Sequence, residues 1–174
     1  MNMSSRLRKF TLTAHITVSV GWLGAVLAYL SLAVVIKTSE DISLVRAAYL
    51  ALEPITSYVL VPLAIASLIT GIVISLGTSW GLFRHYWVIF KLILTVFSII
   101  ILLAFTQSLT RMVSIAADST TSINELREMG AGISHAVGAL VILLIIMILS
   151  VYKPKGMTRY GWQKQQKSRK GSSQ

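Results

Sequence analysis

Four long stretches of the chain are apolar and nearly free of charge. Residues 10–36, 55–83, 92–110 and 129–152 contain no Asp, Glu, Lys or Arg, and Lys91 stands directly before the third of them. A helix needs roughly 20 mainly apolar residues to cross the hydrocarbon core of a bilayer. The pattern therefore predicts four transmembrane helices, at about residues 10–36, 55–78, 86–108 and 131–152.

The composition supports a membrane protein. Hydrophobic residues make up 55% of the chain and charged residues 13%, about half of the roughly 25% that is usual in soluble domains. We expect one all-α domain, a four-transmembrane-helix bundle over residues 1–152, followed by a basic tail over residues 153–174. The first apolar stretch exceeds the roughly 7–15-residue core of a signal peptide, so we expect it to be retained as a span.

The two loops that follow the first and third stretches are expected to be partly helical. Ser39, followed by Glu40 and Asp41, is typical of a helix start, because acids favour the positive end of the helix dipole. The amphipathic segment that follows is expected to end at Pro54. Residues 122–125 (Ser-Ile-Asn-Glu) fit a capping box, which predicts a short helix that ends near Gly130.

Basic and acidic residues are separated along the chain. Twelve basic residues lie before the first span, around the start of the third and after the fourth: Arg6, Arg8, Lys9, Arg84, Lys91, Lys153, Lys155, Arg159, Lys164, Lys167, Arg169 and Lys170. All six acids lie in the other two loops, with only four basic residues. The positive-inside rule then predicts that both termini lie in the cytoplasm. We expect a multi-pass protein of a bacterial plasma membrane. We expect the tail to contact anionic lipid headgroups and not nucleic acid.

Several classes of chemistry are excluded by what the chain lacks. It has no cysteine, so disulfides, thiolate metal sites, iron–sulfur clusters and covalently attached haem are ruled out. It has no Gly-rich phosphate loop, H-E-x-x-H or G-x-S-x-G motif. The predicted spans hold no Asp or Glu, which weighs against a proton- or cation-coupled transporter.

Polar residues are costly inside a span and are therefore candidate functional groups. His15 lies near the cytoplasmic end of the first span, and Ser19 and Trp22 follow on the same helix face. One interpretation makes His15 an axial ligand or proton-handling group, with Trp22 as a wall of its site. The other is a neutral histidine that is hydrogen-bonded at the interface.

Lys91 lies at a similar depth in the third span. Trp87 precedes it by four residues, and Thr95 and Ser98 follow it at four and seven, so the span carries a polar stripe. Lys91 either extends along lipid to the headgroups or faces the bundle near His15, where it would meet a carboxylate or ligate iron.

The other two histidines have different surroundings. His85 stands beside Arg84 at the cytoplasmic start of the third span, where the pair is either interfacial or binds the acidic groups of a ligand. His135, near the outer end of the fourth span, has Gly and Ala at three and four residues on either side. Small neighbours suit the approach of a flat macrocycle, and they equally suit close helix packing. His135 is too far along the bilayer normal from His15 for both to bind one iron.

Two resemblances accompany these residues. The first span contains H-x-x-x-x-x-x-W-x-G, from His15 to Gly24, and the third contains W-x-x-x-K-L from Trp87. This pairing resembles the HemJ-type protoporphyrinogen oxidases and the related CopD-type membrane proteins, in which a first-span histidine is implicated in haem b binding. The HemJ-type histidine two residues before the lysine is replaced here by Ile89. The segments GLFRHYWVIFKL and SVYKPKGMTRYG resemble an uncharacterised bacterial family of predicted integral-membrane proteins, which implies four spans and no particular chemistry.

The preferred hypothesis is a membrane protein that binds haem b or a porphyrin and transfers electrons to a quinone or oxygen if it is redox-active. His15 would be the axial ligand, with His135 a candidate for a second site. Ser19, Trp22 and Trp87 would line the pocket. Arg84 and His85 would contact the propionates, and Lys91 would be a second ligand or a partner for porphyrin carboxylates. If the protein is an enzyme, a haem-dependent oxidoreductase, Lys91 and Trp22 are its candidate catalytic residues.

Two other hypotheses remain open. One is a cofactor-free accessory, assembly or structural protein, and the weaker one is a permease for a small solute or metal. The sequence leaves a homo-oligomer open.

Overall fold

The computed structural model describes residues 3–78 and 81–171, with the backbone alone for residues 167–171. The end of the predicted tail, residues 172–174, and the side chains of its last three basic residues lie outside this description. The helices are α1 (Ser5–Thr38), α2 (Ile42–Ile55), the π-helical turn η1 (Thr56–Leu60), α3 (Val61–Gly77), α4 (Tyr86–Ala117), α5 (Ile123–Met129), the 3₁₀ turn η2 (Gly130–Gly132), α6 (Ile133–Tyr152) and α7 (Arg159–Gly171). The all-α class is confirmed.

Four helical segments, the last of them bent between α5 and α6, are long and apolar enough to cross a membrane. They are Ser5–Thr38, Ile42–Gly77, Tyr86–Ala117 and Ile123–Tyr152. With 30 to 36 residues each, they are about 45–54 Å long at 1.5 Å per residue, against a hydrocarbon core of roughly 30 Å. Part of each segment therefore extends beyond the hydrocarbon.

The prediction that Pro54 ends a loop helix is wrong, because the helix continues through Pro54 into α3. Proline has no N–H and its ring crowds the preceding turn. The π-helical turn η1 follows, and it directly precedes a second proline, Pro62, at the start of α3. Thr56, the first residue of η1, is buried, and its hydroxyl donates to the Leu52 carbonyl at 2.8 Å.

The loop helices otherwise begin near the expected places. Asp41, and not Ser39, caps α2, and its carboxylate accepts from the backbone N–H of Ser43 at 2.8 Å. Ser122 caps α5 as expected, and Gly130 ends that helix with a left-handed φ of 70°.

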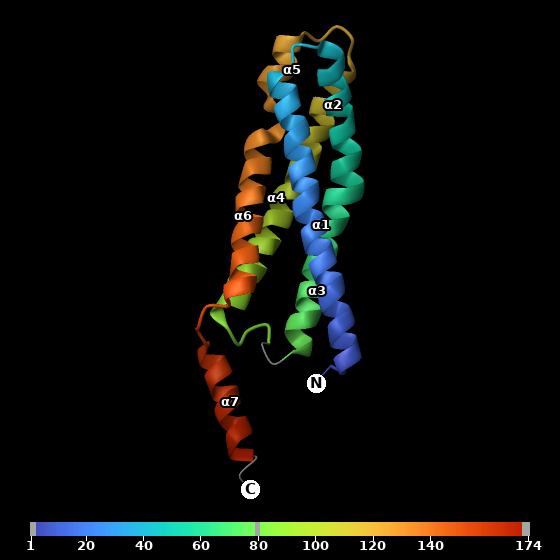
Figure 1. The fold of residues 1–174 in the computed structure, drawn as a ribbon. Coiled ribbons are helices and arrows are strands. Elements are labelled where there is room, and N and C mark those ends of the chain that lie inside the picture. Colours follow the sequence, from blue (N-terminus) through green and yellow to red (C-terminus); the bar gives the residue numbers. More distant parts are fainter. Residues whose placement is uncertain (1–2, 79–80, 172–174) are drawn as a thin grey trace.

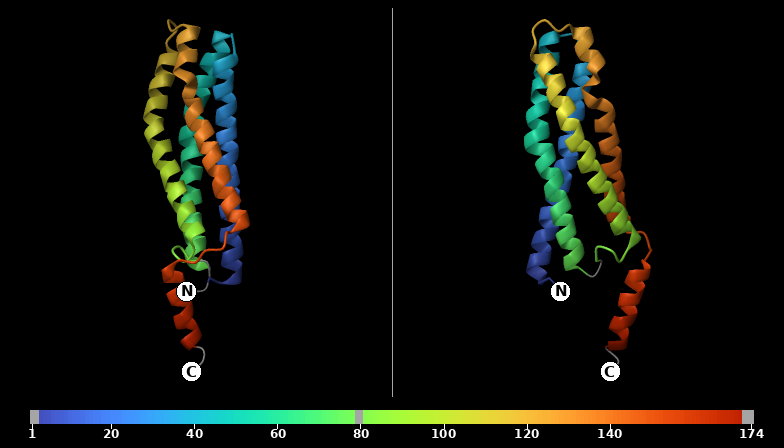
Figure 2. Two further views of the ribbon diagram at one scale, coloured as in Figure 1. Left: turned by 90° about the vertical axis from the view of Figure 1, so that its left-hand side faces the viewer. Right: turned by 180° about the vertical axis from the view of Figure 1, so that it is seen from behind.

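The four segments run antiparallel, so both termini lie at one end of the bundle (Figure 1). We call this the basic end, since it carries the twelve basic residues named above, and the opposite end, which holds every acid, the acidic end. The helices converge at the acidic end and diverge towards the basic end, with α1 and α3 on one side and α4 and α6 on the other (Figures 1 and 2). Most of the fully buried side chains lie towards the acidic end, among them Ala33, Ile36, Val45, Tyr49, Leu52, Leu109, Ala116 and Leu126. Ala64 of α3 is equally buried further along the bundle.

The backbone bends sharply at the acidic end, at the junction between α5 and α6. Gly130, Ala131 and Gly132 all have positive φ, of 70°, 44° and 63°. Alanine is uncommon in this conformation, which costs roughly 1–2 kcal/mol. Ala131 is fully buried, and its carbonyl accepts a 2.9 Å hydrogen bond from the Tyr29 hydroxyl. Tyr29 therefore fixes the point from which α6 enters the bundle.

Candidate functional site

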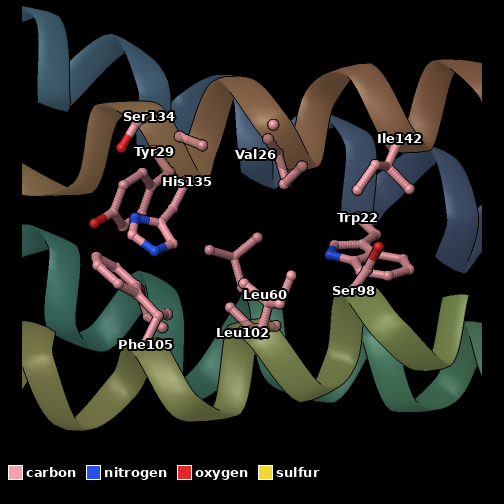
Figure 3. Close-up of a pocket in the computed structure, with 15 residues that line it drawn as sticks. Trp22, Val26, Tyr29, Leu60, Ser98, Leu102, Phe105, Ser134, His135 and Ile142 are labelled. Atoms are coloured by element: carbon pink, nitrogen blue, oxygen red, sulfur yellow. The ribbon is translucent and has the colours of Figure 1, made fainter. Parts of the chain in front are cut away.

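An apolar crevice of about 290 Å³ lies between α4 and α6. Figure 3 shows its walls from these two helices, with side chains of α1 and Leu60 of η1 behind. The side chains that line it are mainly aliphatic and aromatic, and Ser134, His135 and Gly138 on α6 are exposed, so the crevice reaches the molecular surface. Its size is near the lower limit of ligand pockets, roughly 300–1,000 Å³.

The crevice runs along the helix axes. Trp22, Ser98 and Ile142 lie at one end of it, and Tyr29 and His135 at the other (Figure 3). Trp22 and Tyr29 are seven residues apart on α1, a separation of about 10 Å at 1.5 Å per residue. An elongated or flat apolar ligand matches this shape, with its polar part next to His135.

His135 belongs to an aromatic cluster that crosses the crevice. Its imidazole stacks on the Phe105 ring of α4, with centroids 4.7 Å apart and the planes at 26°. The edge of Phe105 in turn meets Tyr29, at 6.4 Å and 74°. Both the left-handed φ of Gly132 and its lack of a side chain are required, because a Cβ there would overlap the Phe105 ring. The backbone bend therefore positions Phe105 against His135.

A second cavity of about 540 Å³ adjoins the crevice on the side of α5. His135, Phe105, Ser134 and Ile101 line both cavities. A ligand larger than the crevice would therefore extend past the Phe105–His135 pair into this second space, and His135 would touch it in either position.

His15 and Ser19 lie elsewhere, in a polar seam between α1 and α3. His15 Nδ1 is 2.9 Å from Thr70 Oγ1, and the Ser19 and Ser67 hydroxyls are 2.9 Å apart. The His15 ring also lies against Gly71, where a Cβ would be 3.2 Å from its Cε1. Of the two interpretations of His15, this arrangement favours the hydrogen-bonded interhelical histidine.

The Thr70 hydroxyl lies 2.7 Å from the Ala66 carbonyl and 3.2 Å from the Ser67 carbonyl. When that hydroxyl donates to a carbonyl, the Nδ1–H tautomer of His15 donates to the Thr70 oxygen, and its lone pair is then on Nε2. Metal-binding histidines are commonly oriented by such a bond, so His15 remains a candidate ligand on chemical grounds.

The other candidate residues lie at the basic end. The Lys91 ammonium is 5.6 Å from the centre of the Trp87 ring, in a cation–π contact. His85 directly precedes α4 and pairs with Met157 of the C-terminal segment through an isolated β-bridge. Arg84 lies in the same short segment, and the Arg84 backbone carbonyl accepts a hydrogen bond from Thr158 N at 2.9 Å. Neither cavity is lined by Arg84, His85, Trp87 or Lys91.

Of the sequence candidates, Trp22 and His135 therefore share one site. Tyr29 and Phe105 complete that site. Neither was identified from the sequence as a site residue, because the sequence of an apolar span does not show which of its aromatic side chains face the other helices. Across residues 3–78 and 81–171, no cluster of three or more His, Asp or Glu side chains is arranged to hold a metal ion.

Comparisons of the chain with protein-family models, with curated proteins and with solved structures found no match.

Proposed function

We propose that the protein binds haem b or a related porphyrin from the bilayer phase, in the crevice between α4 and α6. The observation that carries the proposal is the imidazole of His135 at one end of an apolar crevice whose walls include Trp22, Tyr29 and Phe105. Histidine is the commonest protein ligand of haem iron, and flat aromatic walls suit a macrocycle.

The residues of the crevice fit such a group. Gly138 and Ala139 lie next to His135 on α6 and allow a flat ligand close to the helix backbone. The adjoining cavity adds space on the other side of the Phe105–His135 pair for a ligand too large for the crevice. When bound to a single histidine, haem b supplies one-electron chemistry, whose direction depends on the partner that the protein meets.

The proposal changes the ligand predicted from sequence, from His15 to His135. It leaves Arg84, His85 and Lys91 without a role in holding the porphyrin, because they lie at the opposite end of the spans. If the basic end lies in the cytoplasm of a bacterium, as the positive-inside rule predicts, the crevice is in the outer half of the plasma membrane.

A pair of glycine variants tests the crevice without altering a polar group. A Cβ on Gly138 or on Gly24 meets nothing within 4 Å, so both positions accept a larger side chain without overlap at that atom. Gly138 lines the crevice and Gly24 does not. The protein is expressed with ample haem supply, purified in mild detergent and measured for bound haem per protein.

We expect Gly138→Leu to lose most of the haem and Gly24→Leu to keep the wild-type amount. A helical circular dichroism spectrum equal to that of wild type shows that either variant is folded. A wild-type protein without a Soret band, or equal haem content in the two variants, contradicts the proposal.

A second candidate function is a cofactor-free accessory or assembly protein. The seam between α1 and α3 favours it, since His15 and Ser19 there take part in helix packing and not in a cavity. The same haem measurement decides between the two, because this candidate predicts a colourless wild-type protein.

A further inference from the structure

The side of α4 that faces away from the bundle carries polar groups near the acidic end. Gln107, Arg111 and Ser114 are all exposed, and their spacings of four and three residues place them on one side of the helix. In the view from behind, α4 lies in front of the other helices (Figure 2). Polar side chains on the outside of a span are typical of a surface that meets another protein, because lipid tails offer them no hydrogen bond.

The depth of these groups follows from the length of α4. With 32 residues, α4 is about 48 Å long, so a hydrocarbon core of roughly 30 Å centred on it ends about 9 Å before Ala117. Arg111 precedes Ala117 by six residues and lies at that boundary, and Gln107 lies about 6 Å further in. The Gln107 amide is therefore within the hydrocarbon.

The chain itself supplies no partner for these two side chains. Neither the Gln107 amide nor the Arg111 guanidinium makes a hydrogen bond or ion pair in the part of the chain that the structure describes. Glu53 of α2 accepts from the Thr110 hydroxyl at 3.4 Å and does not pair with Arg111. A primary amide has two donors and an acceptor oxygen, and leaving it without partners in hydrocarbon is costly. A partner from outside the chain would remove that cost.

The short helix α5 places an opposite charge beside α4. Glu125 is exposed, and its carboxylate has no ion pair within the described residues either. Met129, one turn later on the same side of α5, lines the second cavity together with Met112 of α4. Arg127 points instead to the loop before α2, where its guanidinium donates to the Ser39 carbonyl. Glu125 is therefore on the side of α5 that borders α4.

We propose that a second copy of this chain docks on the surface formed by Gln107, Arg111 and Glu125, which we call the α4–α5 face. The face is self-complementary, since it carries one cation, one anion and an amide that both donates and accepts. A two-fold axis places Arg111 of each copy opposite Glu125 of the other and brings the two Gln107 amides together. This contact goes beyond the proposed function, because it needs no ligand in the crevice.

Energy transfer between copies tests the proposal. Full-length protein is labelled with a donor or an acceptor dye at the C-terminus and reconstituted in phosphatidylcholine liposomes at a series of protein-to-lipid ratios. We expect wild type to show energy transfer that falls on dilution with lipid, as a reversible dimer does. Arg111→Glu and Glu125→Arg are each expected to lower the dimerisation constant at least about tenfold, because like charges then meet across the axis.

A mixture of the two single variants distinguishes pairing between copies from pairing within one chain. Donor-labelled Arg111→Glu and acceptor-labelled Glu125→Arg together form both ion pairs, so we expect their energy transfer to return to the wild-type level. The double variant in one chain is expected to recover as well. Recovery in the double variant without recovery in the mixture overturns the proposal, since an ion pair within the chain gives that result. A wild type that is monomeric at every ratio also overturns it.

The amide is tested separately, with a control on another helix. Gln107→Leu is expected to lower the dimerisation constant about tenfold, because the reciprocal hydrogen bonds of the two amides are lost. Tyr58→Leu replaces an exposed polar side chain of η1, away from the α4–α5 face, and is expected to keep the wild-type constant. An unchanged constant in Gln107→Leu, or an equal loss in Tyr58→Leu, overturns the assignment of this face.

Discussion

Replacing Tyr29 by Phe removes a single hydroxyl from the acidic end of the bundle. That hydroxyl donates at 2.9 Å to the carbonyl of Ala131, a fully buried residue. The Tyr29 side chain is itself only 4% exposed, so no water replaces the lost donor. A buried carbonyl without a partner costs about 1–3 kcal/mol, and here it belongs to a residue already in an unfavourable left-handed conformation. We therefore expect Tyr29→Phe to lower the free energy of unfolding by about 1–3 kcal/mol.

The assay is thermal unfolding of the purified protein in detergent, followed by circular dichroism. For a chain of this size, each kcal/mol corresponds to roughly 2–4 °C in the midpoint. Tyr58→Phe is the matched control, because Tyr58 is 80% exposed, and we expect a change within about 0.5 kcal/mol. If Tyr29→Phe shifts the midpoint no more than Tyr58→Phe, the role assigned to this hydrogen bond is refuted.

Three further predictions concern the same end of the protein. The Arg46 guanidinium donates to the carbonyl of Ala116 in the last turn of α4 and to the carbonyls of Asp118, Ser119 and Thr121 just beyond it. We expect Arg46→Ala to lower the free energy of unfolding by about 1.5–3 kcal/mol, while Arg111→Ala, with the same change in charge, has a smaller effect in denaturant titration. Gly132→Ala is expected to cost roughly 1–3 kcal/mol, because its φ is 63° and the added methyl group meets the Phe105 ring, whereas Gly138→Ala is tolerated in the same titration. The Ser43 hydroxyl and backbone N–H donate to the Asp41 carboxylate and hold its pKa below the ordinary value of 3.8. The stabilisation is therefore present above that value and is lost as the pH falls through the lowered pKa. Asp41→Ala should lower the unfolding midpoint near neutral pH, and the difference from wild type should be smaller in strong acid.

The sequence was sufficient to predict the spans, since long uncharged runs have few alternatives to crossing a bilayer. It was also sufficient for the Ser122 cap and the Gly130 stop, which depend on local chemistry. It was misleading at Pro54, because proline removes only one backbone donor, and a membrane-spanning helix that packs on its neighbours can continue past it.

The candidate site was less predictable for a different reason. Depth along the bilayer follows from residue counting, and on that basis Lys91 was expected to lie near His15 if its side chain faces the bundle. The side that a helix presents to its neighbours does not follow from counting when every side of the helix is apolar. The structure places Trp22 and His135 at opposite ends of one crevice, and it hydrogen-bonds His15 to Thr70 in the seam between α1 and α3.

The choice between those two histidines is tested most directly by the visible spectrum, oxidised and dithionite-reduced, of the purified His135→Ala and His15→Ala variants. We predict that the Soret band, and its shift on reduction, disappear in His135→Ala and persist in His15→Ala. A band that persists in His135→Ala and disappears in His15→Ala would contradict the assignment of the crevice as the haem site.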